Sequence, residues 1–216
     1  FAISNPYLKI VLSLNYFLMY SFTSNAGICH EFLHNNVFKS KTLNVFFFKL
    51  FSLLNWTNYS FSMTSHWEHH FYTLSSKDPK QIIRRPLSLK DLLFFLLFDM
   101  RSSYFRLKYL VLNSLNIIPT IFLKSYPDFQ NTKREIFLTA RCIIGFHFLL
   151  ISLFVFTNSF WLILFVNLAP FCFTFLNKIF AISQHFGKSE NSNIFYSTRT
   201  FVANKYLMFL YANMNY

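Results

Sequence analysis

Charged residues are scarce in this sequence, and acidic residues are the scarcest among them. Only 13% of the 216 residues are Asp, Glu, Lys or Arg, whereas 54% are hydrophobic. This composition disfavours a soluble domain and is typical of a membrane protein. Eight acidic residues against twenty basic ones leave a net charge of +12, which in a membrane protein marks loops on the cytoplasmic side.

The sequence also lacks the signatures of two other kinds of protein. Its basic residues are spread between apolar segments and no nucleic-acid-binding motif appears, which argues against nucleic acid as a partner. The three cysteines, Cys29, Cys142 and Cys172, are odd in number and lack metal-ligand spacing, so we interpret them as small core residues. The chain has no initial Met and no cleavable leader, and we expect it to be an internal fragment.

Histidine clusters are the feature that the sequence does contain. HEFLH and HWEHH place imidazoles three or four residues apart, which on a helix brings them to one face. Ionisable groups set among hydrophobic segments are costly and therefore usually functional. The pattern predicts a metal site at a membrane surface, and the number of histidines fits two metals better than one tetrahedral zinc. The candidate ligands are His30, His34, His66, His69, His70 and His185.

Imidazole ligands alone leave the identity of the metal open between iron, zinc, copper and nickel, with iron as the redox-active choice for dioxygen chemistry. The alternative is that histidines are packed in a helix core without a metal. We favour that alternative for His147, which stands alone within IIGFHFLLISLF. A haem protein is a further alternative, but it predicts paired single histidines within spans rather than clusters.

The hydrophobic segments predict an all-α, multi-pass membrane protein with interfacial helices and a metal site that faces the cytoplasm. We expect a single domain over residues 1–216, truncated at both ends. Residues 7–29 are long enough for a spanning helix that ends at His30. Residues 142–157 and 160–177 predict a transmembrane hairpin, which returns His185 to the side of the first two clusters.

The remaining segments are expected at the interface or in loops. Residues 43–63 separate the first two histidine clusters, so a single crossing would place the clusters on opposite sides. We therefore expect this segment to lie along the interface or to dip in and return. Residues 107–123 have basic flanks and contain Pro119, which predicts an interface-bound helix. The polar run 75–91 predicts an exposed cytoplasmic loop, and Trp56 and Trp67 are candidate interface anchors.

Several stretches together resemble the integral-membrane fatty acid desaturase family. They are HEFLHNNVFKSKTLN (30–44), SHWEHHFYTL (65–74), QHFG (184–187), STRT (197–200) and YANMNY (211–216). In that family, HxxxH and HxxHH boxes are followed by a hydrophobic hairpin and an additional histidine. A third box, roughly HxEHH, commonly follows a phrase like NMNY, and this chain ends where that box is expected to begin.

The resemblance implies a non-haem centre of two iron ions, held by the six histidines named above, with His147 outside the ligand set. One branch of the family has an asparagine four residues before the additional histidine, where this chain has Ala181. Neighbouring residues are candidates for orienting the imidazoles, with solvated surface groups as the alternative: Glu31, Asn35 and Glu68. Arg199 is a candidate partner for a carboxylate near the site or for lipid headgroups.

The implied activity is oxygen-dependent desaturation of a long-chain fatty acyl group, bound as lipid, CoA or carrier-protein ester. Dioxygen is the oxidant, and the electron donor is a protein such as ferredoxin or cytochrome b5. Basic loops at 75–91 and 101–108 suit an acidic donor, although cytoplasmic retention explains the same charges. The alternatives are a hydroxylase of the same superfamily, acting on alkane, carotenoid, sterol or sphingoid chains, and an inactive membrane fragment. We expect residues 1–216 alone to bind iron poorly and to be inactive.

Overall fold

The structure is a computed structural model of the chain, and its helices carry the predicted metal ligands. It describes residues 5–24, 27–79, 88–90, 100–172, 179, 183–185, 187–188, 194–198, 202 and 204–210. Within these residues the secondary structure is helical and no strand occurs, which confirms the all-α class.

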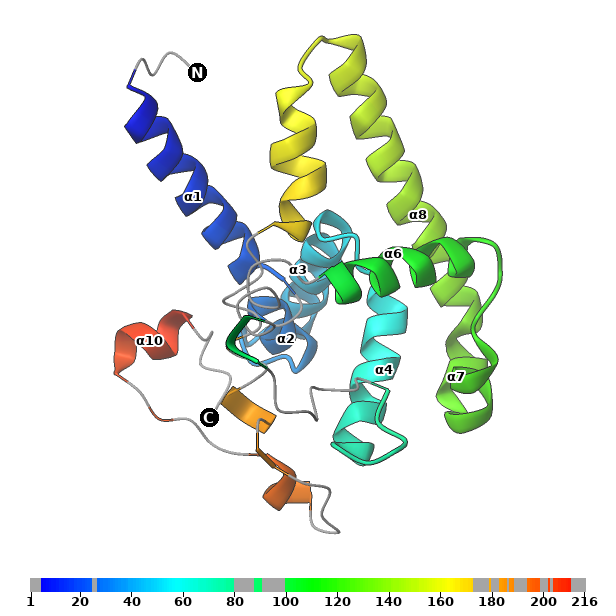
Figure 1. Cartoon of the computed structure of the whole chain (residues 1–216). Helices are drawn as coiled ribbons and strands as arrows, with labels where there is room; N and C mark the ends of the chain where they lie inside the picture. Colours follow the sequence, from blue (N-terminus) through cyan, green and yellow to red (C-terminus); the bar gives the residue numbers. More distant parts are fainter. Residues whose placement is uncertain are drawn as a thin grey trace.

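The α-helices are α1 (Pro6–Phe22), α2 (Ile28–Leu33), α3 (Lys41–Leu54), α4 (Tyr59–Tyr72), α6 (Met100–Ser114), α7 (Thr120–Ser125), α8 (Asp128–Phe156) and α10 (Lys205–Leu210). A π-helix, η1 (Ile163–Leu168), and two 3-10 helices, η2 (Ala169–Phe171) and η3 (Ile194–Ser197), complete the described elements. In Figure 1, α1, α8 and η1 extend to one end of the molecule, α2 and α4 lie towards the other, and α6 runs crosswise between them.

The helix α8 forms the first half of the predicted hairpin. Among the described residues, it is the one helix long and apolar enough to cross a membrane. The chain turns after Phe156, with Asn158 in the left-handed region at φ 52°, and returns through η1 (Figure 1). The turn therefore lies where the polar pair Asn158 and Ser159 predicted it, although α8 begins well before residue 142. The described part of the returning half ends at Cys172, so its predicted end at residue 177 lies outside the described residues.

The prediction of one helix over residues 7–29 is wrong. The helix α1 ends at Phe22 after 17 residues, and a separate helix, α2, begins at Ile28 and carries the first histidines. The physical reason lies at Gly27, where the chain folds back against the end of α1. A Cβ atom there would lie 2.1 Å from the Phe22 carbonyl oxygen, so the fold needs a residue without a side chain at this position.

Residues 43–63 form two helices joined by a short turn. The helix α3 ends at Leu54, and α4 begins after Asn58, whose side chain accepts a hydrogen bond from the Phe61 backbone N–H. This interruption allows α2 and α4 to approach each other, so the expected meeting of the two histidine clusters is confirmed by the distances given below. Whether the segment lies at a bilayer interface stays a prediction.

The end of α3 is a polar junction between the apolar helices, which we call the α3 junction (carbonyls of Leu53, Leu54 and Asn55). The last carbonyls of a helix have no partner within the helix and need one elsewhere. Here side chains of other helices supply it: His147 of α8 bonds to Leu53 (2.9 Å), Tyr20 of α1 to Leu54 (2.9 Å) and Arg106 of α6 to Asn55 (3.1 Å). The junction thereby ties α1, α6 and α8 to one point.

The predicted interfacial helix over residues 107–123 is also two helices. The helix α6 ends at Ser114, and α7 begins after Pro119, because proline cannot continue a helix from its N-terminal side. Between them Asn116 is left-handed, with φ 64°. The polar run 75–91 is described only at residues 75–79 and 88–90.

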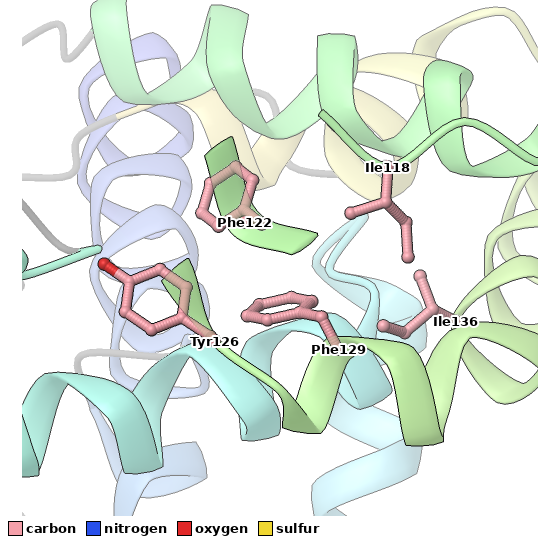
Figure 2. Packing of buried hydrophobic residues seen from close by; sticks show 5 residues of the cluster. All are labelled: Ile118, Phe122, Tyr126, Phe129 and Ile136. Carbon is pink, nitrogen blue, oxygen red and sulfur yellow. The ribbon is translucent and has the colours of Figure 1, made fainter. Parts of the chain in front are cut away.

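An aromatic and aliphatic cluster holds α7 and the start of α8 against α4. Its buried members are Ile118, Phe122, Tyr126, Phe129 and Ile136 (Figure 2). Phe61 of α4 completes it, with ring centroids 5.1 Å from those of both Phe122 and Phe129. Burying one such side chain stabilises a fold by roughly 1.5–3 kcal/mol. The cluster therefore fixes the helix that carries HWEHH.

Candidate metal centre

Two short stretches of helix present the first histidines. The helix α2 carries His30 and ends at His34, and its buried Cys29 and Phe32 pack against Phe48 of α3. The helix α4 carries HWEHH in its last turns. The ligating atoms of His30, His34, His66 and His70 all lie within 4.8 Å of one another. We call these residues the four-histidine group.

The nitrogen atoms of this group have the spacing of metal ligands. The Nε2 atom of His66 lies 2.9 Å from Nε2 of both His34 and His70, and the last two atoms are 3.3 Å apart. Metal–nitrogen bonds of about 2.0–2.1 Å place neighbouring ligands about 2.9–3.4 Å apart in octahedral or tetrahedral geometry. Three mutually close nitrogens cannot all satisfy one another by hydrogen bonds, because a neutral imidazole carries a single N–H. The triangle has the geometry that a shared cation would need.

His30 lies beside His34 and His66, and His70 lies at the solvent-exposed side of the group. The His30 ring centroid lies 4.6 Å from that of His34 and 4.7 Å from that of His66. Within the group His66 is buried, whereas His70 is exposed. The His70 side of the group is therefore accessible to solvent.

His69 and His185 form a neighbouring pair outside the four-histidine group. On a helix, His66 and His70 are one turn apart, whereas His69 lies about 100° around the axis from His70. Its ring centroid is 6.2 Å from that of His66 but 5.4 Å from that of His185. The structure therefore sorts the predicted ligands into a group of four and an adjacent pair.

In three of these imidazoles, Nδ1 lies within hydrogen-bond distance of a carboxylate or carbonyl oxygen, which can accept a hydrogen bond but cannot donate one. Nδ1 of His30 lies 2.7 Å from Glu31 Oε1, Nδ1 of His69 lies 2.8 Å from Asp78 Oδ1, and Nδ1 of His185 lies 3.3 Å from the Ser197 carbonyl oxygen. Each ring must donate its proton there, which leaves Nε2 with a lone pair. This arrangement is typical of metal-binding histidines, whose second nitrogen donates to a carboxylate or carbonyl.

Glu31 is held in the charged form that this role needs. Burial opposes its ionisation, but the hydrogen bonds from His30 and Asn36 and the electrostatic influence of the nearby His30 and His34 rings together bring the pKa of Glu31 below its usual value. The Asn36 amide donates to Glu31 Oε2 over 3.2 Å. Glu31 is thus clamped between an imidazole and an amide.

The other predicted orienting residues lie elsewhere. Asn35 is exposed and left-handed, with φ 61°, and it closes the end of α2 while its neighbour Asn36 contacts Glu31. Glu68 is buried, and the pKa of its carboxyl is raised by burial and by the negative charge of Asp128. Among the described residues, neither has a hydrogen bond to an imidazole. Arg199 and Ala181 lie outside the described residues.

The structure confirms His147 as a packed, hydrogen-bonded core residue. It is fully buried in α8, and its two ring nitrogens lie 2.9 Å from the Leu53 carbonyl oxygen and from the Asn167 amide. Trp56 donates its Nε1–H to the Asn167 carbonyl over 2.8 Å, and its predicted place at a bilayer interface stays a prediction. Trp67 is exposed beside His34, with ring centroids 5.5 Å apart.

Sequence reasoning missed Asp78, Asn36 and the Ser197 carbonyl. Asp78 follows His69 by nine residues and lies beyond the end of α4, so helical periodicity gives no sign of it. The available signal was the polar turn SSKDP directly after the histidine cluster, because Asp is favoured in turns that fold back on a helix end. A backbone carbonyl such as that of Ser197 has no sequence signal.

Comparison with known proteins gives a family but no individual relative. The model of one family, described as fatty acid desaturase, matches residues 7–216. No curated protein and no solved structure matches the chain.

Proposed function

The chain belongs to the fatty acid desaturase family, and from this premise we propose that it catalyses oxygen-dependent desaturation of a long-chain fatty acyl group at a histidine-ligated di-iron centre. The observation that carries the proposal is the convergence of imidazoles from α2 and α4, with ligating atoms within 4.8 Å of one another. The adjacent pair, His69 and His185, supplies ligands for a second iron.

The reaction explains why a redox metal is needed. Methylene groups in an acyl chain have no acidic proton, so an acid or base side chain cannot remove their hydrogens. Conversion of –CH2–CH2– to –CH=CH– gives up two electrons and two protons. The electron donor adds two more electrons and the solvent two more protons, so that dioxygen becomes two waters. Bound iron would supply the activation of dioxygen. The chain's own residues hold the ligands, and Glu31 keeps the His30 proton on Nδ1.

A multi-pass membrane location with the histidines on the cytoplasmic side fits the distribution of apolar and charged residues. Exposed apolar side chains cover α1 and the far part of α8, among them Val11, Phe148 and Phe156. The helices α2 and α4, which carry histidine clusters, lie towards the other end of the molecule (Figure 1). Surface that is apolar over whole helices suits lipid. The acyl substrate would then approach from the bilayer.

The proposed partners are the acyl substrate, dioxygen, membrane lipid and a small electron-transfer protein such as a ferredoxin or cytochrome b5. The net charge of +12 supports an acidic donor. Arg101 and Lys108 of α6 are exposed and available to such a surface.

Expression of the full-length protein in a heterologous host, followed by mass spectrometry of its fatty acids, tests this proposal. Wild-type protein should yield an acyl product lighter by two hydrogens, and H66A should yield none, because His66 is central to the four-histidine group. K133Q, at an exposed position of α8, is the matched control and should behave as wild type. A product heavier by one oxygen would favour the hydroxylase alternative, and an unchanged profile would contradict both.

A further inference from the structure

A buried carboxylate outside the histidine motifs reaches back into the metal centre. Asp78 lies in the turn after α4 and is only 2% exposed. Its Oδ1 accepts from Nδ1 of His69 over 2.8 Å, and its Oδ2 accepts from the Leu74 backbone N–H over 2.9 Å. The two oxygens therefore connect an imidazole to the backbone of the turn that follows its own helix.

This hydrogen bond selects which nitrogen of His69 is available. A carboxylate oxygen cannot donate, so the single proton of a neutral imidazole must lie on Nδ1, and the lone pair lies on Nε2. The Ser197 carbonyl has the same effect on His185, whose Nδ1 lies 3.3 Å from it. The two rings, with centroids 5.4 Å apart, are thus both prepared to ligate through Nε2.

The turn that carries Asp78 is itself held in place by the hydrophobic cluster of Figure 2. The Tyr126 hydroxyl, which points out of that cluster, donates to the carbonyl of Lys77, the residue before Asp78 (Figure 2). Leu74 is buried and left-handed, with φ 61°, a backbone state that persists only where the surroundings impose it. The packing of α7 against α8 therefore helps to fix the turn that carries Asp78, and through Asp78 the orientation of the His69 imidazole.

We propose that Asp78 is a positioning residue for the second metal ion, holding His69 in the tautomer and orientation that ligate beside His185. This inference rests on the proposed function, because it assumes that the His69 and His185 pair binds iron. A purely structural role would need only the bond to Leu74. The additional bond to His69 assigns Asp78 to the metal centre.

Iron release from the purified full-length protein into a chelator tests the inference without measuring activity. Two reference variants assign the release phases: H185A removes a ligand from the His69 and His185 pair, and H34A removes one from the four-histidine group. The phase that each variant changes belongs to the iron at that position. In D78N, one carboxylate oxygen becomes an amide, so either His69 or Leu74 loses its acceptor. D78N should release the His185-dependent iron roughly 10- to 100-fold faster, in line with the loss of other carboxylate partners of metal ligands, while the other phase is unchanged.

S75A is the matched control, because it removes a hydrogen bond of the same turn, from the Lys77 N–H to Ser75 Oγ (3.1 Å), without touching His69. Its release phases should equal those of wild type. Equal effects of D78N on both phases, or equal effects of D78N and S75A, would overturn the inference while leaving the proposed function intact. Wild-type protein that retains no iron would overturn the proposed function itself.

D78E covers the case in which D78N does not fold. It keeps the negative charge but moves the acceptor by one methylene, so selective acceleration of the same phase is expected, with thermal unfolding as the check on folding. Release from D78E identical to wild type would contradict the positioning role.

Discussion

The imidazole of His147 lies face to face with the indole of Trp56, with ring centroids 3.8 Å apart and planes inclined by 10°. Its Nε2 must donate to the Leu53 carbonyl, because a carbonyl oxygen only accepts, and its Nδ1 then accepts from the Asn167 amide. His147 is therefore a neutral histidine whose polar atoms are both paired. It joins α8 and η1 to the α3 junction, and so joins the hairpin to the helices that lead to the metal centre.

Replacing His147 by alanine should destabilise the fold without removing a metal ligand. The H147A variant removes the imidazole that donates to the Leu53 carbonyl and accepts from the Asn167 amide, and it opens a cavity beside Trp56. Together these losses should lower the free energy of unfolding by about 2–4 kcal/mol. Thermal unfolding in detergent measures this. F148A is the control, because Phe148 is 67% exposed. Loss of iron from folded H147A with unchanged stability would instead identify His147 as a ligand.

Replacing Glu68 by glutamine should stabilise the metal-free protein at neutral pH. Burial and the charge of Asp128 raise the pKa of Glu68, so its charged form is disfavoured in the folded state. The penalty is absent below the ordinary pKa of a glutamate, where both states are protonated, develops as the pH rises towards the raised pKa and is full above it. E68Q lacks this penalty, so its stability advantage over wild type should grow with pH and then level off. Unfolding temperatures measured across a pH series test the sign. Destabilisation by E68Q would indicate that Glu68 orients an imidazole after all.

Two glycines should respond in opposite ways to alanine. G27A brings a Cβ atom to 2.1 Å from the Phe22 carbonyl oxygen, so it should separate α1 from α2 and cost at least about 1–3 kcal/mol. G145A meets nothing within 4 Å on α8 and should stabilise that helix by about 0.5–1 kcal/mol. Circular dichroism during thermal unfolding compares the pair. A harmless G27A would contradict the close approach of the two helices.

Iron should stabilise the folded protein, because the close Nε2 atoms of the four-histidine group repel one another without a cation. Binding at a free iron concentration about 100-fold above its dissociation constant adds about 2.7 kcal/mol. Treatment with a chelator should therefore lower the unfolding temperature of wild type but have a smaller effect on H66A. The same decrease in both proteins would place the bound iron elsewhere.

The histidine motifs predicted the candidate metal centre because the spacing of residues along a helix determines which side chains share a face. Residues 66 and 70 share a helix face, and residues 30 and 34 lie within one helical turn, so their convergence needs only that the two helices meet. Helical geometry places His69 on the opposite side of His66 from His70, but its pairing with His185 depends on a distant part of the chain. Asp78 could not be found in this way, because its contact with His69 depends on a turn held by Tyr126, the residue after α7.

The extent of the helices was harder to predict than their existence. The prediction of one helix treats residues 7–29 as a single apolar stretch, although they contain the polar run TSNAG at 23–27. The helix α1 ends at Phe22, directly before this run, and Gly27 lies against the Phe22 carbonyl. The turn before α4 likewise lies at a polar interruption, since Asn55 and Asn58 break the apolar stretch 43–63. Polar interruptions were the better guide, since Pro119 and Asn158 both lie at breaks that the structure contains.

The most direct test of the central claim is the iron content of the purified full-length protein, compared between wild type, H66A and H185A by metal analysis and Mössbauer spectroscopy. A di-iron centre predicts two irons per chain in wild type, a spectrum of non-haem iron, and loss of iron from a different position in each variant. A wild-type protein that contains zinc alone, or iron that both variants retain in full, would contradict it.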